Sequence, residues 1–413
     1  MRRRSTSVAV LPDELASVGD VMEALRAYAK ETGKKPLMLG GWEVEHPTIA
    51  PPPGLLRRLS EGRLRLRQYT HASDLRHARE AASDLFGGSI RFAGSPITER
   101  HVSIQQNSTQ ALLLALAALK ERGARRVVIA APAYFAVETI CRSLGLEMVV
   151  VPASDFLTGA LDITRLVDAA RLPGSVALVT NPAYSVGVEY GAEALNTLAR
   201  ELPPYTWLLL DETRLGLSWR EAAPWRRTDL PPRAIIIRSP SKIFFIHGRK
   251  LSLLVADLAL VREIEQLGEA LVGSLAGDLA SVALAYLEYW RQWRDEAAAA
   301  DAGPMMRWRS AALAALQENL AAAECALAPA GFHLSPVDSG PYTLAAVPRD
   351  RLAHLGQMEA ALRLGVLVMD GRYFLHEHPA WQGFRINLCG APPRQTEALA
   401  RLLAFWRQTS ALI

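Results

Sequence analysis

The chain has 413 residues, half of them hydrophobic, and a formal net charge of +4. This length and composition predict a globular protein with a large core and two or more structural units. Basic residues are dispersed and nearly balanced by acidic ones, which excludes the concentrated basic stripe that nucleic acid requires, so we expect no nucleic-acid partner.

The three cysteines, Cys141, Cys325 and Cys389, are spread along the chain. Few and unclustered thiols indicate a reducing cytoplasm and argue against a disulfide or zinc framework, so we expect a cytoplasmic protein without a metal site. The arginines near the start precede an apolar stretch that Pro12 and Asp13 soon break. We therefore expect no targeting signal and no membrane segment.

The first two thirds of the chain are predicted to alternate between helices and strands. Repeated Leu and Ala residues predict a helix from Ser108, which can cap it, to about residue 120. Further helices are expected at residues 161–170 and 192–201. Apolar runs predict buried strands at residues 126–130, 147–151, 176–180, 207–211, 234–238 and 251–255. Strands that are apolar on both faces and separated by helices predict an α/β fold with a mostly parallel sheet sandwiched by helices.

A second unit is expected to begin near residue 300. The Ala-rich stretch at residues 297–330 is interrupted at Gly303 and Pro304, and its larger apolar side chains recur at helical spacing. After it we expect a strand at residues 342–347, a helix at 355–364, a strand at 384–389 and a closing helix from about residue 394.

The clearest chemical signal is the run Ser239-Pro240-Ser241-Lys242, followed by Gly248-Arg249-Lys250. A lysine amine can form a Schiff base with an aldehyde cofactor. The serine three residues before it and a cation eight residues after it are suited to bind a phosphate of that cofactor. Taken alone, the run is equally compatible with a surface lysine.

Five other motifs accompany Lys242 in a fixed order along the chain: Asn107-Ser108-Thr109-Gln110, Pro132-Ala133-Tyr134, residues 181–187, Asp211-Glu212 and Arg385. With these motifs the chain resembles the class I/II aminotransferases of the fold-type-I pyridoxal-phosphate family, from about residue 37 to the C-terminus. The resemblance implies a large cofactor-binding domain at residues 56–302. It implies a smaller α+β domain from residues 1–55 and 303–413, and a homodimer with composite active sites.

The resemblance also implies roles for individual residues around pyridoxal 5'-phosphate. Lys242 would hold the cofactor as a Schiff base, Asp211 would face its pyridine nitrogen, and Tyr134 would stack on its ring. The phosphate contacts implied by the resemblance come from Ser108, Thr109, Ser239, Lys250 or its neighbour Arg249, and Tyr69 of the other subunit. A simple helix cap at Ser108 and core packing of Tyr69 are the alternatives.

For the substrate, Arg385 would hold the α-carboxylate, and Gly41 and Trp42 would form the N-terminal substrate loop. Two positions depart from the family. Its asparagine and tyrosine that hydrogen-bond the phenolic oxygen of the cofactor align with Tyr184 and Arg214, and Asn181 is an alternative to Tyr184.

We therefore expect a pyridoxal-phosphate enzyme that acts on an α-amino acid, with transamination to a 2-oxoacid as the leading reaction. The two departures keep a lyase, a β- or γ-replacement enzyme, a cyclase or an oxidase of a specialised biosynthetic pathway open. A cofactor-binding regulator is a minor alternative, because the residues before the resemblance are too few for a DNA-binding module.

Overall fold

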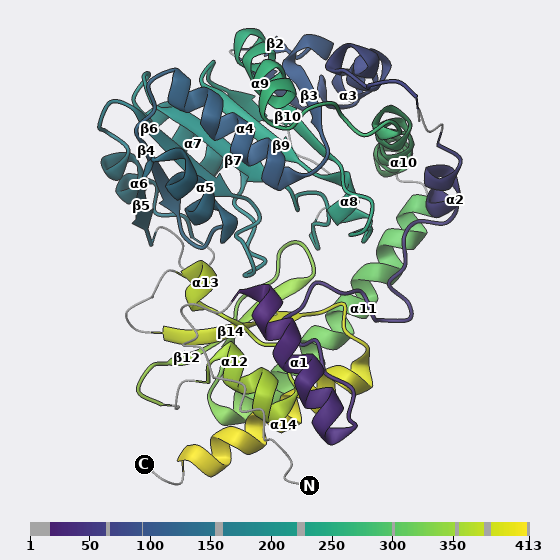
Figure 1. The fold of residues 1–413 in the computed structure, drawn as a ribbon, viewed down its shortest axis with the longest axis vertical. Coiled ribbons are helices and arrows are strands. Elements are labelled where there is room, and N and C mark those ends of the chain that lie inside the picture. The colour runs from purple at the N-terminus through teal and green to yellow at the C-terminus, as the bar shows by residue number, and fades with distance from the viewer. Residues whose placement is uncertain are drawn as a thin grey trace, which may run out of the picture.

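The structure is a computed structural model, and it describes residues 17–62, 67–92, 94–152, 160–220, 228–299, 302–351, 355–375 and 381–410. Figure 1 shows two bodies, an upper one built on a large sheet and a lower one built on a smaller sheet. Helix α11 (Pro304–Leu327) extends between them.

The large sheet has seven strands in the order β3-β10-β9-β7-β6-β4-β5. The five strands from β9 to β5 are parallel, and β10 runs antiparallel to both of its neighbours. This arrangement confirms the predicted mostly parallel sheet. The strands span Val102–Gln105 (β3), Arg126–Ala130 (β4), Glu147–Val151 (β5), Ser175–Thr180 (β6), Trp207–Glu212 (β7), Ala234–Arg238 (β9) and Ser252–Val255 (β10).

Both faces of the parallel part of this sheet pack against hydrophobic clusters, which explains why its parallel strands are largely apolar. In β7, Leu209 enters one hydrophobic cluster, whereas Leu208 and Leu210 enter another. Full burial of each such side chain contributes about 1.5–3 kcal/mol. One cluster is formed with α4 (Ser108–Glu121), α5 (Ala136–Leu144) and α9 (Leu258–Leu271); the other is formed with α3 (Arg76–Phe86), α6 (Ile163–Ala169), α7 (Ala192–Glu201) and α10 (Leu279–Ala298).

The smaller sheet is antiparallel, in the order β11-β12-β14-β13. Its strands span His333–Leu334 (β11), Tyr342–Pro348 (β12), Met369–Asp370 (β13) and Trp381–Asn387 (β14). Helices α1 (Val18–Thr32) and α14 (Pro392–Ser410) lie in the same body (Figure 1), and Leu37 forms a bridge with Val366. The N-terminal and C-terminal parts of the chain therefore meet in one α+β body, as expected; the boundaries at residues 55 and 302 stay predictions.

The remaining elements are short. They are α2 (Leu55–Ser60), α8 (Pro240–Ile243), α12 (Gln357–Glu359), α13 (Arg372–Leu375), a π-helix at Ala360–Leu364, 3-10 turns at Ala72–Leu75, Glu99–His101 and Ala328–Ala330, and a three-stranded sheet of β1 (Ile90–Phe92), β2 (Ser95–Pro96) and β8 (Thr228–Leu230).

Two local expectations were wrong. The cap of α4 is Asn107, whose side chain accepts a hydrogen bond from the Gln110 amide, and Ser108 is the first residue of the helix. The strand expected at residues 384–389 is β14, which begins and ends earlier at Trp381–Asn387. Its pairing with β12 from Tyr342 to Pro348 sets these bounds.

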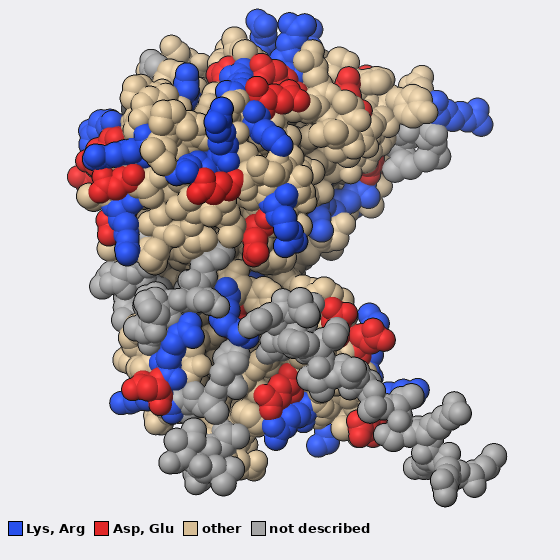
Figure 2. Space-filling view, turned by 60° about the vertical axis from the view of Figure 1, so that its left-hand side comes forward, with Lys and Arg blue, Asp and Glu red and all other residues tan. Residues whose placement is uncertain are grey.

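Charges are mixed over the visible surface. Figure 2 shows Lys and Arg side chains interspersed with Asp and Glu side chains on the upper body. Among the described residues, no helix is both long enough and apolar enough to cross a membrane.

Candidate functional site

A cavity of about 390 Å³ lies at the carboxyl ends of the parallel strands. Thr180 ends β6, Asp211 lies at the end of β7, and Ser239 follows β9 directly. This edge is where an open α/β sheet presents its ligand crevice. The predicted residues that line the cavity are Trp42, Ser108, Thr109, Tyr134, Tyr184, Asp211, Arg214, Ser239, Lys242 and Lys250.

Lys242 lies on the short helix α8, immediately after β9. Burial lowers the pKa of its amine to about 7, and the nearby positive charges of Arg214, Lys250 and Arg385 act in the same direction. An amine with this pKa is substantially uncharged near neutral pH. It is therefore a competent nucleophile and a competent base.

Asp211 is buried at the end of β7. Its Oδ1 accepts hydrogen bonds from the amide of Thr213, at 3.1 Å, and from the Thr213 hydroxyl. Burial raises the pKa of the carboxyl, against the opposing effect of these hydrogen bonds. Among the described residues nothing donates to Oδ2, so this oxygen is available to a ligand. A cationic donor there would favour the ionised carboxylate.

Hydroxyl groups and a helix N-terminus form another part of the wall. Ser108 and Thr109 begin α4, and the positive end of this helix dipole favours anions. The Thr109 hydroxyl lies 3.2 Å from the hydroxyl of Tyr134. Ser239 and the cation Lys250 line the same cavity. This set is suited to hold a phosphate group.

Arg249 and Tyr69 do not line the cavity. The guanidinium of Arg249 forms an ion pair with Asp278, so Lys250 is the cation of this turn that faces the cavity. The side chain of Tyr69 is 78% exposed. Core packing of Tyr69 within its own chain is therefore wrong, and its contact with a second subunit stays a prediction.

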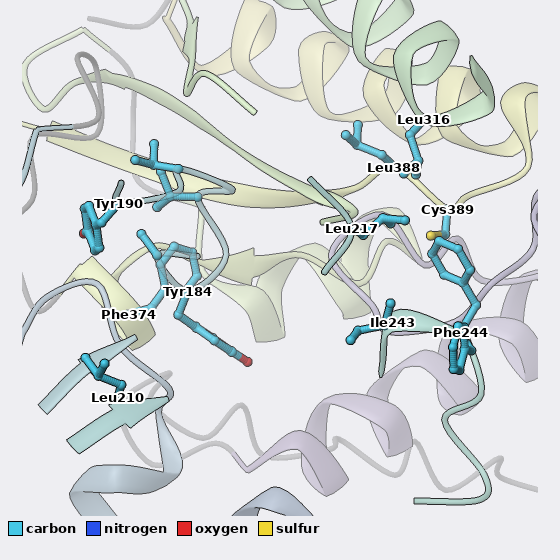
Figure 3. Packing of buried hydrophobic residues seen from close by; sticks show 14 of the residues in the cluster. Tyr184, Tyr190, Leu210, Leu217, Ile243, Phe244, Leu316, Phe374, Leu388 and Cys389 are labelled. Carbon is cyan, nitrogen blue, oxygen red and sulfur yellow. The ribbon is translucent and has the colours of Figure 1, made fainter. Parts of the chain in front are cut away.

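Asn181 and Tyr184 lie in different environments. Both ends of the Asn181 side chain bind the backbone of Tyr190, at 2.9 Å and 3.4 Å, and the residue is buried. Tyr184 lines the cavity, with its ring centroid 5.4 Å from that of Tyr134. Figure 3 shows Tyr184 packed beside Phe374. Of the two alternatives, Tyr184 is the residue within reach of a ligand.

Arg385 is fully buried in β14 and holds the N-terminal loop. Its Nε donates to the carbonyl of Gly40 at 3.1 Å, and Nη2 donates to the carbonyls of Gly40 and Gly41. The guanidinium also packs 5.0 Å from the ring centroid of Trp42. The structure thus brings Arg385, Gly41 and Trp42 together. Of these three, only Trp42 lines the cavity itself.

Arg214 and Arg385 pack on the same aromatic ring. Their guanidinium carbons lie 4.4 Å and 4.5 Å from the ring centroid of Tyr342. Nη2 of Arg214 also donates to the Tyr342 hydroxyl at 3.2 Å. Because Arg214 lines the cavity and Tyr342 begins β12, this stack connects the two bodies beside the site.

Among the cavity residues that the sequence analysis missed are Thr180, Thr213 and His247. Thr180 is buried, and its hydroxyl has no hydrogen-bond partner among the described residues. Thr213 fixes Asp211, and no local pattern points to it. His247 lies five residues after Lys242 and binds the backbone of Trp42; burial, with Arg214 and Lys242, lowers its pKa to about 4. The position of Thr180 at the end of an apolar run was the one available signal.

The chain shares 24% identity over 180 residues with histidinol-phosphate aminotransferase of Moorella thermoacetica, covering 43% of this chain and 46% of that protein. The match therefore spans about half the length of that curated relative.

Solved structures extend the likeness over the whole chain. An aminotransferase from Mycobacterium tuberculosis is 20% identical with a TM-score of 0.72, covering 97% of this chain and 99% of its own. A double mutant of Thermus thermophilus aspartate aminotransferase is 17% identical with a TM-score of 0.73, covering 96% and 97%. At these identities the likeness shows the fold.

The family model described as aminotransferase class I and II matches residues 60–403. Because this match spans most of the chain, the protein belongs to the class I and II aminotransferase family.

Proposed function

We propose that the protein is a pyridoxal 5'-phosphate-dependent aminotransferase that acts on an α-amino acid, with a 2-oxoacid as the amino acceptor. The observation that carries this proposal is the shared cavity of Lys242, Asp211 and the N-terminus of α4. Pyridoxal phosphate is the cofactor of this family. Its aldehyde, pyridine nitrogen and phosphate correspond in kind to these three features.

The residues present fit this cofactor. Oδ2 of Asp211 is without a donor among the described residues, and the raised pKa of the carboxyl indicates that a cationic partner is needed to favour its charge. The hydroxyl of Thr180 is buried without a partner in the same part of the chain. A ring with a protonated nitrogen and polar substituents would satisfy both groups. When bound, this cofactor supplies an electron sink for the substrate α-carbon.

Within this proposal, Lys242 holds the cofactor and then moves the substrate α-proton, because its amine titrates near neutral pH. Asp211 keeps the pyridine nitrogen protonated, and Thr213 keeps Asp211 oriented. Tyr134 stacks on the ring. The phosphate contacts are Ser108, Thr109, Ser239 and Lys250.

Substrate binding is assigned to the buried arginine of β14. Arg385 binds the α-carboxylate through its planar fork. It now donates to the carbonyls of Gly40 and Gly41, so the loop that carries Gly41 and Trp42 must shift to release those donors. Binding of the amino acid and movement of this loop are therefore coupled.

We further propose a cytoplasmic homodimer whose two sites each take Tyr69 from the partner. The strong exposure of Tyr69 supports this assignment, since an apolar ring of this size gains from burial at an interface. The unpaired state of Cys141, Cys325 and Cys389 supports the compartment.

A second candidate is γ-elimination or γ-replacement, and His247 favours it. The lowered pKa of this imidazole keeps it uncharged at neutral pH, and it lines the cavity with Lys242. An uncharged imidazole is a second base, which removal of a β-proton would require. Loss of a substrate γ-substituent, seen by mass spectrometry and abolished in His247→Phe, would favour this candidate over transamination.

The covalent link gives the first test. Borohydride reduction of the purified protein, followed by peptide mapping, is expected to find the cofactor fixed on Lys242. Lys242→Ala should abolish fixation, whereas Lys120→Ala, on the far end of α4, should leave it intact. An adduct on Lys250 would contradict the assignment.

A further inference from the structure

Arg214 forms no ion pair with an acidic side chain in the described part of the chain, although its charge acts to lower the pKa of Asp211 in the same cavity. Within the described residues, the one hydrogen bond of its guanidinium goes to the hydroxyl of Tyr342, at 3.2 Å. By contrast, the buried guanidinium of Arg238 lies 2.8 Å from the carboxylate of Glu212. An arginine side chain stays protonated in proteins, so Arg214 brings a full positive charge to the cavity wall.

Tyr342 holds that charge in place. The guanidinium carbon of Arg214 lies 4.4 Å from the ring centroid, a distance at which the ring face attracts a cation. The hydroxyl of the same residue accepts the hydrogen bond. Two contacts from one neutral side chain orient the guanidinium without neutralising it.

We propose that Arg214 is a positioning residue that acts through Lys242: its guanidinium, which is in no ion pair among the described residues, keeps the amine of Lys242 in the uncharged form that attacks an aldehyde. In that step the amine nitrogen adds to the aldehyde carbon and one water molecule leaves. An ammonium has no lone pair for this addition. The proposal rests on the proposed function, in which Lys242 forms the covalent link.

The groups around Lys242 support this role. Burial is the main cause that lowers its pKa, and Arg214 is the first of the charged causes, ahead of Lys250 and Arg385. Asp211 acts in the opposite direction. Around the amine, three cations therefore act to lower its pKa and one acid acts to raise it.

The neutral groups nearby do not compensate for these cations. His247 has a pKa lowered to about 4, so it is uncharged at the pH at which Lys242 titrates. Burial raises the pKa of the Tyr134 hydroxyl, which is therefore also uncharged there. Removing the charge at position 214 must then raise the pKa of Lys242, because a like charge disfavours the ammonium.

Competitive labelling measures this pKa directly. Full-length protein freed of cofactor is treated with trace acetic anhydride at a series of pH values, and acetylation of Lys242 is quantified by peptide mass spectrometry. For the wild type we expect a midpoint near pH 7. Arg214→Met should raise the midpoint by about one pH unit and slow labelling about tenfold below the midpoint.

Three further variants distinguish the effect of the charge at position 214 from the effect of the side-chain shape there. Arg214→Gln is a second neutral variant that can still hydrogen-bond Tyr342, and it should shift the midpoint as Arg214→Met does. Arg214→Lys should restore a midpoint close to that of the wild type. Arg262→Met removes an exposed charge on α9 and should change nothing.

Unshifted midpoints in both neutral variants would overturn the proposal, and so would an equal shift in Arg214→Lys. Borohydride mapping on unlabelled samples of the same proteins, loaded again with cofactor, keeps this result separate from the proposed function. An adduct on Lys242 with unshifted midpoints would reject only the role of Arg214. Absence of any adduct would reject the proposed function, whatever the midpoints.

Discussion

Asp211→Asn tests the pairing of a buried carboxylate with a cationic ring nitrogen. Oδ1 of Asp211 accepts the two hydrogen bonds from Thr213, and an asparagine oxygen can keep them. The change is therefore confined to Oδ2, where a neutral amide group replaces the charged oxygen. Since burial raises the pKa of Asp211, its ionised form is costly in the cofactor-free protein, and the variant should fold at least as stably as the wild type above pH 5.

The loaded enzyme should respond in the opposite direction. Two opposite charges about 4 Å apart attract each other by about 4 kcal/mol at an effective dielectric constant of about 20. If the variant loses about two thirds of that attraction while negative charge develops on the ring, removal of the α-proton would slow about 100-fold. The assay is exchange of the substrate α-hydrogen in deuterated water, followed by NMR at saturating cofactor.

Asp168→Asn is the matched control, because it makes the same change at an exposed ion pair with Arg171. This variant should exchange the α-hydrogen at the wild-type rate. Exchange within threefold of the wild type in Asp211→Asn, with cofactor bound, would refute the reasoning.

Three other outcomes are expected. Arg385→Lys should raise the KM for the amino acid about 10- to 100-fold with a smaller change in kcat, since an ammonium lacks the planar fork; an unchanged KM would assign the carboxylate to another residue. Gly365→Ala should destabilise the protein by about 1–3 kcal/mol in chemical denaturation, because a Cβ would lie 2.1 Å from the Tyr28 ring at a φ of +63°, while Gly88→Ala, in open space, should be neutral. Mixing inactive Lys242→Ala and Tyr69→Phe chains should restore activity through one intact site; no recovery after proven subunit exchange would argue against sharing.

The fold was predictable because strands that are buried on both faces have a recognisable apolar sequence. Each strand of the parallel sheet contributes side chains to clusters on both faces, as Leu208 and Leu209 do, so the strands are recognisable as uninterrupted apolar runs. A polar residue such as Asp211 at the end of such a run lies at the carboxyl edge of the sheet. Its place in the cavity follows from that topology.

Other features depend on contacts that no local sequence pattern predicts. Asn107 and Ser108 can both cap a helix, and the extended backbone of Asn107, with φ of −164°, decides between them. Arg249 and Lys250 are adjacent cations. Asp278, distant in sequence, holds Arg249 away from the cavity and leaves Lys250 to line it.

The central claim is that this cavity moves an amino group from an amino acid to a 2-oxoacid, and nitrogen tracing tests it most directly. The holoenzyme is incubated without oxygen with a panel of ¹⁵N-labelled amino acids and an unlabelled 2-oxoacid, and the products are analysed by mass spectrometry. We predict that ¹⁵N appears in the amino acid formed from the 2-oxoacid, in equal amount to the new 2-oxoacid, and that Lys242→Ala abolishes this transfer. Release of the ¹⁵N as ammonia, with none in the acceptor, would contradict it.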